Sequence, residues 1–349
     1  MTVSTSEKAD RTLTGGRNCS IDIFRCICAL LVILNHADPL WDLNILKLQQ
    51  LNLTVTNFAV AFFSMTAGFF FTRSLTNGKK ALLPYLKRLF IPYALWSLLY
   101  FAIEFFSGGA ENIVGFVKSC AIRFLLSGSA YHFWYFPAVM ISAVITAAFF
   151  RCRAEKLLLP LSFAMFAYFV VLLDYSWLFR GAAEAANAPV VYDTITVKRI
   201  FFVAFPYFCG GFLVKLLTEK NNFLRRNSTA VLIVSALLYA AEYILLAGKG
   251  VMAPTVIFGQ YFMSAALLLF LVEHPMPAKL KIAKKCRYFA GLSYYIHPAL
   301  IMAVDALYGL AFRAAVPSAL RFALVCALCA ALSETLRKLN NKYLNVISC

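Results

Sequence analysis

The sequence predicts an all-α, polytopic integral membrane protein with about ten transmembrane helices and both termini in the cytoplasm. Three observations lead to this fold class. Of the 349 residues, 62% are hydrophobic and the mean hydropathy is +0.75, well above the usual composition of a soluble domain. Apolar runs long enough to cross a bilayer fill most of the chain after residue 19. Lys and Arg gather in alternate connecting segments, as they do in cytoplasmic loops.

About ten apolar segments match the length of a membrane-crossing helix. In chain order they are 20–37, 52–72, 89–106, 132–150, 157–174, 199–217, 229–247, 254–272, 288–311 and 316–336. They form one predicted membrane domain at 19–337, with cytoplasmic tails at 1–18 and 338–349. The first apolar run holds charges and lacks a small-residue cleavage site, which indicates a retained helix rather than a signal peptide. Between the third and fourth spans, IVGFVKSCAIRFLL is too broken to span and predicts an interfacial amphipathic helix.

The basic residues set the predicted orientation. With the amino terminus inside, the inner segments hold most of the 33 Lys and Arg residues, which requires an even number of spans. The net charge of +17 therefore reflects cytoplasmic loops, and we expect no nucleic-acid partner. The ten cysteines lie mostly in apolar runs, where a thiol packs as a small hydrophobic group. Cys326 and Cys329 form a C-x-x-C without a second pair or a nearby His, so we expect no metal site.

The first span, from Ser20 to Ala37, carries Asp22, Arg25 and His36. His36 follows Arg25 by eleven residues, which is three helical turns plus about 20°, so the two side chains share a face. Asp22 precedes Arg25 by three residues and lies near the same face. An Arg facing lipid costs about 2.5–3.5 kcal/mol, so this stripe should face protein or a water-filled path. Two interpretations follow, a structural Asp22–Arg25 pair with an interfacial histidine, or a functional site.

Two further segments place basic or aromatic residues next to the ends of predicted spans. The inner loop from Arg73 to Lys87 and Arg88 could hold phosphates beside a helix start, or could simply follow the positive-inside bias. The stretch YHFWYFP places His132 and Trp134 at the predicted outer end of the fourth span. Its aromatic residues are typical of a membrane belt, and His132 is either part of that belt or a site residue.

Two more segments lie within spans. In the ninth, Tyr295 and His297 precede Pro298, whose missing N–H frees a backbone carbonyl nearby. A helix-packing role and a substrate-binding role are both open for His297. In the second, the small residues of Ser64–Gly68 favour close helix contact. A hydroxyl nucleophile there would need an adjacent base, which the sequence does not place.

Taken together, these segments resemble acyltransferase family 3, integral membrane enzymes that O-acetylate surface polysaccharides, peptidoglycan, lipopolysaccharide and macrolides. The family's best marker, a basic residue followed by ten residues and a His, falls on Arg25 and His36, and its D-x-x-R adds Asp22. The segments NFAVAFFSMTAGFF, YLKRLFIPYALW, YHFWYFPAVMI and GLSYYIHPALI resemble four further family segments in the same order. The resemblance covers nearly the whole chain. Ala67 departs from the Ser that the family usually has.

The resemblance implies an O-acyltransferase of a bacterial cell membrane, with acyl-CoA as co-substrate and no bound cofactor. The acyl group is acetyl by family default, and the acceptor is a hydroxyl of a cell-surface glycan or lipid-linked saccharide. A neutral histidine can take the proton from an attacking hydroxyl, and we assign that role to His36. Arg25 would hold the donor's phosphates or line its path, and Asp22 would orient Arg25.

The remaining candidate substrate and coenzyme A contacts are spread over the chain. They are Arg73, Lys87, Arg88, His132, Trp134, Tyr295 and His297. Lys87 and Arg88 do not form the family's pair of arginines three apart. The main alternative function is a transporter of an amino acid or glycan intermediate, because similar membrane domains also occur fused to amino-acid racemases and intramembrane charges suit a carrier. A scaffold without chemistry is the third class.

Overall fold

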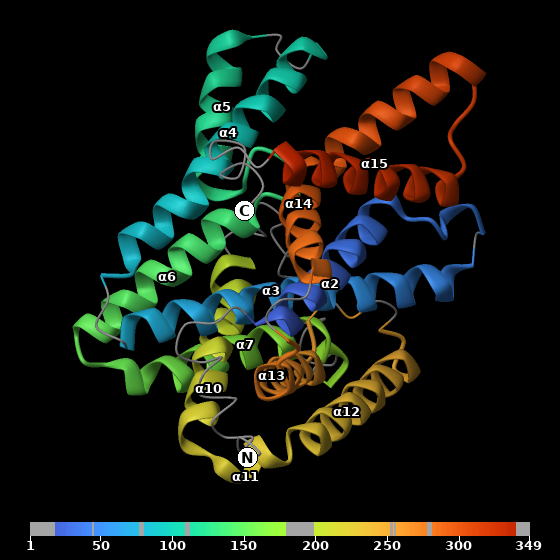
Figure 1. Ribbon diagram of the computed structural model, residues 1–349. Coiled ribbons are helices and arrows are strands. Elements are labelled where there is room, and N and C mark those ends of the chain that lie inside the picture. Colours follow the sequence, from blue (N-terminus) through green and yellow to red (C-terminus); the bar gives the residue numbers. More distant parts are fainter. Residues whose placement is uncertain are drawn as a thin grey trace. The chain divides into compact units, whose positions relative to one another are not determined.

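In the part of the chain that the computed structural model describes, every regular element is a helix (Figure 1). The described residues are 18–43, 45–76, 80–108, 112–178, 199–251, 254, 256–277 and 281–339. The helices are α2 (Cys19–Ala37), α3 (Leu46–Thr76), α4 (Leu82–Phe106), α5 (Ile113–Leu126), α6 (Tyr135–Arg151), α7 (Leu158–Leu173), α10 (Phe205–Lys220), α11 (Asn222–Arg226), α12 (Ser228–Gly248), α13 (Phe258–Glu273), α14 (Lys281–Phe312) and α15 (Ser318–Leu339). Most of both predicted tails lies outside the described residues.

Within the described ranges, eight helical segments are long and apolar enough to cross a membrane. The other two predicted spans, the fourth and the eighth, correspond to the shorter apolar helices α6 and α13. With 17 and 16 residues they are about 25 Å long, slightly less than a hydrocarbon core of about 30 Å. The prediction of an all-α polytopic membrane protein is therefore confirmed.

Several helices extend beyond the predicted apolar segments. α3, α4 and α14 each begin six or seven residues before the expected start, because polar and basic turns continue the helix outside the apolar run. The 32 residues of α14 span about 48 Å, more than a bilayer core needs. The expected helix between the third and fourth spans is α5, capped by Asn112, whose side chain accepts from Val114 N. No residue of α5 is buried, and its place at the membrane interface stays a prediction.

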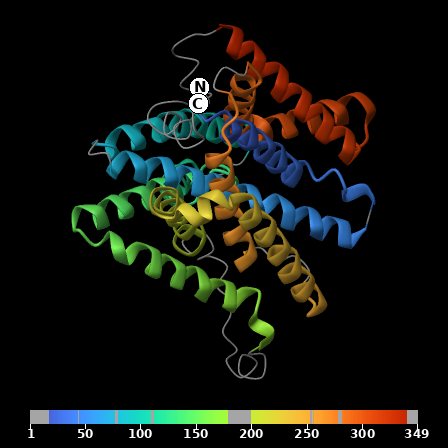
Figure 2. The ribbon, with the colours of Figure 1, turned by 60° about the horizontal axis from the view of Figure 1, so that its bottom comes forward.

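The chain divides into two compact units. The first comprises residues 1–63, 216–255 and 262–349, and its centre is formed by α2, α14 and α15. α14 packs along both α2 and α15, as Figures 1 and 2 show. Apolar side chains join these helices in one buried cluster. Its members are Ile33, Ala37, Val304, Val316, Val325 and Cys329.

Contacts inside the first unit report the directions of its helices. Asp22 lies beside Arg287 near the start of α2, and His36 lies beside His297 at its end, so α2 and α14 run in the same direction. Ser20 Oγ donates to the backbone oxygen of His274, directly after α13, so α13 ends where α2 begins. These directions are those expected for the first, eighth and ninth of ten spans.

The second unit comprises residues 64–215 and 256–261, with α4, α5, α6, α7, and the carboxyl-terminal part of α3. A π-helix, η6 (Arg199–Ala204), precedes α10 and packs against α6. Gly68 of α3 lies so close to α10 that an added Cβ would stand 2.7 Å from the backbone carbon of Phe208. A Cβ on Gly211 would likewise stand 2.8 Å from the backbone carbon of Gly68. The predicted role of the small residues in close helix contact is confirmed.

Candidate functional site

The end of α2 brings together two histidines that are far apart in the sequence. His36, in the last turn of α2, stacks on His297 of α14 with ring centroids 5.2 Å apart and planes inclined by 20°. His297 is fully buried and His36 is half-buried. The carbonyl oxygen of Ser293 can only accept, so His297 Nδ1 carries the hydrogen in their 2.8 Å bond. In the neutral ring this bond selects the tautomer with the lone pair on Nε2.

The other end of the α2 stripe is also lined by protein. Asp22 Oδ2 lies 3.9 Å from Arg287 Nη1 of α14, an ion pair that was not predicted from the sequence. The Arg25 guanidinium stands 5.8 Å from the ring centroid of Phe63 in α3, within cation–π range. The stripe therefore faces neighbouring helices. That Asp22 orients Arg25 stays a prediction.

A third helix, α15, reaches the end of α2 through Arg321. Its Nε and Nη2 donate to the carbonyl oxygen of Ala37, the residue after His36, at 3.1 and 2.8 Å. Its Nη1 lies 3.6 Å from Asp305 Oδ2 of α14. Neither ionisable residue was predicted as a site residue, although each lies in a predicted span, where such residues are unusual and often functional.

The segment that follows α2 is fixed to the first turn of α15. Asp38 ends α2 in the left-handed conformation, with φ of 41°. Asp42 Oδ2 accepts from Ser318 N, and Ser318 Oγ donates to the backbone oxygen of Pro39 at 3.0 Å. The hydrogen bonds from Ser318 hold the pKa of Asp42 below its ordinary value. Burial raises the pKa of Asp38, although the nearby Arg321 opposes this shift.

The predicted phosphate contacts belong to the second unit. Arg73 lies half-buried in the last turn of α3. Lys87 of α4 is exposed and lines an otherwise apolar groove of about 450 Å³ between α4 and α6. Arg88 is also exposed, and its guanidinium stands 5.7 Å from the Tyr85 ring. These positions are basic and accessible, and their role toward coenzyme A stays a prediction.

The predicted aromatic site residues lie before and at the start of α6. His132 is buried, with its ring centroid 4.2 Å from that of Phe133 and 5.5 Å from that of Tyr100. Trp134 directly precedes α6 and receives the Arg199 guanidinium 5.6 Å from its ring. In the first unit, Tyr295 is buried in α14. These surroundings suit packing as well as substrate binding, so both predicted roles remain open.

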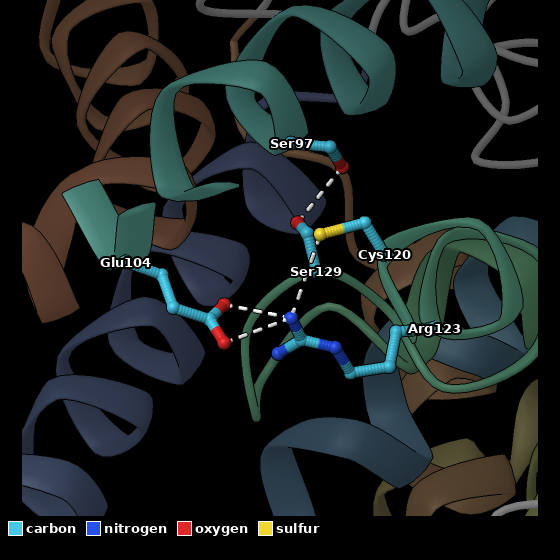
Figure 3. A network of polar contacts seen from close by, with 5 residues as sticks. All are labelled: Ser97, Glu104, Cys120, Arg123 and Ser129. Atoms are coloured by element: carbon cyan, nitrogen blue, oxygen red, sulfur yellow. Dashed lines mark hydrogen bonds and ion pairs between the residues drawn. The ribbon is translucent and has the colours of Figure 1, made fainter. Parts of the chain in front are cut away.

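A polar network in the second unit ties α5 and the loop after it to α4 (Figure 3). Arg123 Nη2 donates to both carboxylate oxygens of Glu104, at 2.9 and 2.7 Å. Ser129 Oγ donates to Ser97 Oγ at 2.8 Å. Figure 3 also shows Cys120 Sγ beside Arg123, at 3.8 Å from Nη2. The network orders the segment that leads to His132. Within the described ranges, no group of three His, Cys, Asp or Glu side chains could hold a metal ion.

Comparisons with known proteins agree with the fold and the motifs. A family model described as an acyltransferase domain, acyltransferase 3, matches residues 18–336. The chain is 26% identical over 313 residues to an amino-acid racemase of Enterococcus faecalis, covering 82% of this chain and 41% of the relative. It is 26% identical over 220 residues to a serine/alanine racemase of Enterococcus gallinarum, covering 59% and 30%.

The chain spans less than half the length of these curated relatives. No solved structure gives a significant match. The family match nevertheless extends from the cap of α2 to the last turns of α15, and so includes both histidines and every helix that carries a predicted site residue. With its membrane-spanning helices and its ordered motifs, the chain belongs to the acyltransferase 3 family of membrane acyltransferases.

Proposed function

We propose that the chain moves an acetyl group from acetyl-CoA to a hydroxyl of a cell-surface glycan or lipid-linked saccharide at a bacterial cell membrane. Membership of the acyltransferase 3 family supports acyl transfer. The proposed mechanism rests on one observation, the stack of His36 on His297 at the end of α2. Two imidazoles in contact, one with its tautomer selected by a backbone oxygen, suit general acid–base work on a hydroxyl.

In the proposed reaction, the acceptor hydroxyl attacks the thioester carbonyl while His36 takes its proton. A C–O bond forms, the C–S bond breaks, and coenzyme A leaves as a thiolate that receives the proton from the His36 imidazolium. Such a base typically contributes about 10²–10⁴-fold to the rate. His297 is the proposed positioning residue, because its ring lies against His36 and its own orientation is held by Ser293 O.

Arg25 is the proposed anion contact in the first unit. Asp22 is engaged by Arg287, whereas the Arg25 guanidinium rests on an aromatic ring, and its Nε meets no hydrogen-bond acceptor among the described residues. Guanidinium groups bind phosphates through charge-assisted hydrogen bonds, which suits the diphosphate of coenzyme A. The further proposed donor and acceptor contacts are Arg73, Lys87, Arg88, His132, Trp134 and Tyr295.

The test uses purified protein in lipid nanodiscs, acetyl-CoA labelled in the acetyl group, and a mixture of cell-surface glycans as acceptors. We expect free coenzyme A and labelled glycan in equal amounts, and a loss of about 10²–10⁴-fold for His36→Ala. His274→Ala is the matched control, because His274 Nδ1 bonds within its own chain segment to Phe270 O. Wild-type turnover by His36→Ala would contradict the assignment. Mass spectrometry of the labelled product identifies the acceptor.

The relatives named as racemases favour one alternative, a carrier for an amino acid. Proteoliposomes loaded with buffer and exposed to labelled serine distinguish the two functions. A carrier accumulates serine and releases no coenzyme A above background. The proposed acyltransferase releases coenzyme A above background and accumulates no serine.

A further inference from the structure

We propose that Arg321 is a positioning residue that holds the two histidines in register, an inference that rests on the proposed function. A single guanidinium on α15 contacts the end of α2, which carries His36, and the helix α14, which carries His297. Neither the resemblance nor the family match assigns a role to this residue.

The first contact fixes the end of α2. The last carbonyls of a helix have no donor within the helix, so Ala37 O needs a partner from elsewhere. Arg321 supplies two, at 3.1 and 2.8 Å, at a residue that is fully buried. A cation at the carboxyl end of a helix is also favoured by the helix dipole. Because Ala37 directly follows His36, any movement of this carbonyl moves the imidazole as well.

The second contact fixes α14 relative to the same guanidinium. Asp305 Oδ2 lies 3.6 Å from Arg321 Nη1. Asp305 follows His297 by eight residues, about 12 Å along a continuous helix. The planar guanidinium presents its donors in a fixed geometry, so it relates the Ala37 carbonyl to Asp305 more tightly than an ammonium group would.

A second set of hydrogen bonds, made by Ser318, also joins the first turn of α15 to the segment that follows α2. Ser318, three residues before Arg321 and therefore near the same face of α15, bonds to Asp42 and to Pro39 O. The anchors at Ser318 and Arg321 lie on both sides of Asp38, where α2 ends. The end of α2 is therefore held against α15 at its last residue, Ala37, and again in the segment that follows it.

The ion pair between Arg321 and Asp305 contributes little to stability. A positioning role can therefore be distinguished from a purely structural one. The Asp305 side chain is 41% exposed, and exposed ion pairs add little net stability. By contrast, a displacement of about 1 Å at a reacting group can cost about 10²-fold in rate. Loss of this ion pair alone, as in Asp305→Asn, should therefore reduce catalysis far more than it reduces stability, whereas Arg321→Ala also removes both donors to the buried Ala37 carbonyl.

The test compares Arg321→Ala, Arg321→Lys and the milder Asp305→Asn with a control, Arg337→Ala. Arg337 is on the same helix and pairs with Glu334, also on α15, so its loss changes charge without touching α2. We expect Arg321→Ala to lower kcat about 10–100-fold with little change in the KM for acetyl-CoA, and added guanidinium to restore part of it. Arg321→Lys and Asp305→Asn should lie between Arg321→Ala and the wild type, and Arg337→Ala should match the wild type.

A second measurement does not depend on activity. The protein has four histidines, so ¹⁵N-histidine NMR in nanodiscs can assign each ring by single substitution. Arg321→Ala should shift the His36 and His297 signals and leave those of His132 and His274 in place. Unchanged His36 and His297 signals in both Arg321→Ala and Asp305→Asn would overturn the proposal. If the wild type transfers no acetyl group, the proposed function fails, and the NMR result still decides whether Arg321 positions the pair.

Discussion

The contact between α3 and α10 in the second unit allows a quantitative prediction for Gly68→Ala. A Cβ at this position would stand 2.7 Å from the Phe208 backbone carbon and closer still to its oxygen, whereas ordinary contact begins at 3.4 Å. The two helices would have to separate by at least about 0.7 Å, the difference between those two values. Backbone atoms cannot rotate out of the way as a side chain can, so relaxation requires a shift of a whole helix.

Overpacking of a well-filled contact typically costs about 1–3 kcal/mol. Because the opposing atoms here are backbone, we expect a loss of unfolding free energy at the upper end, about 3 kcal/mol. Equilibrium unfolding in mixed micelles with increasing denaturing detergent measures this quantity. Thermal unfolding in the same lipid mixture checks that both methods rank the variants in the same order.

Gly115→Ala is the matched control for this substitution. Gly115 lies in α5 of the same unit, and the nearest atom to an added Cβ is 3.8 Å away in the Asn112 side chain. Ala is favoured over Gly in a helix by about 1 kcal/mol, so this variant should be as stable as the wild type or more so. A Gly68→Ala protein within about 0.5 kcal/mol of the wild type would refute the close packing of α3 on α10.

Three further predictions concern single contacts. His297→Phe keeps an aromatic ring against His36 but loses the bond to Ser293 O, so acetyl transfer in the labelled acetyl-CoA assay should fall at least about 10-fold; wild-type turnover would contradict this. Asp42→Asn should lower the melting temperature at pH 7, and this difference should shrink as the pH falls below about 4, because the lowered pKa contributes stability that is lost as the pH falls through the folded-state pKa; a pH-independent difference would exclude this linkage. Asn112→Ala removes the cap of α5 and should lower the free energy of unfolding by about 1 kcal/mol, measured by detergent unfolding. An unchanged free energy of unfolding would contradict this cap.

The sequence alone was sufficient for the helices and for the placement of three candidate site residues along one helix. Helical rise and rotation per residue are constant, so the spacing of Asp22, Arg25 and His36 already predicts one stripe on α2. Apolar length predicts the spans, and small residues at Ser64–Gly68 predict close packing. The first span was expected at 20–37 and the helix runs over Cys19–Ala37.

Contacts between helices could not be obtained in the same way. The pairing of Asp22 with Arg287, the stack of His36 on His297 and the reach of Arg321 to Ala37 all join residues far apart in the chain. Periodicity shows which face of a helix is polar, but it contains no information about which other helix lies opposite that face.

The sequence therefore determined that this is a helical membrane protein of the acyltransferase 3 family with a polar stripe on its first span. Only the tertiary structure decided that His297 lies beside His36 and that Arg321 contacts Ala37, at the end of that stripe. The physical reason is that helix geometry is local, whereas the choice of neighbours depends on how whole surfaces pack together.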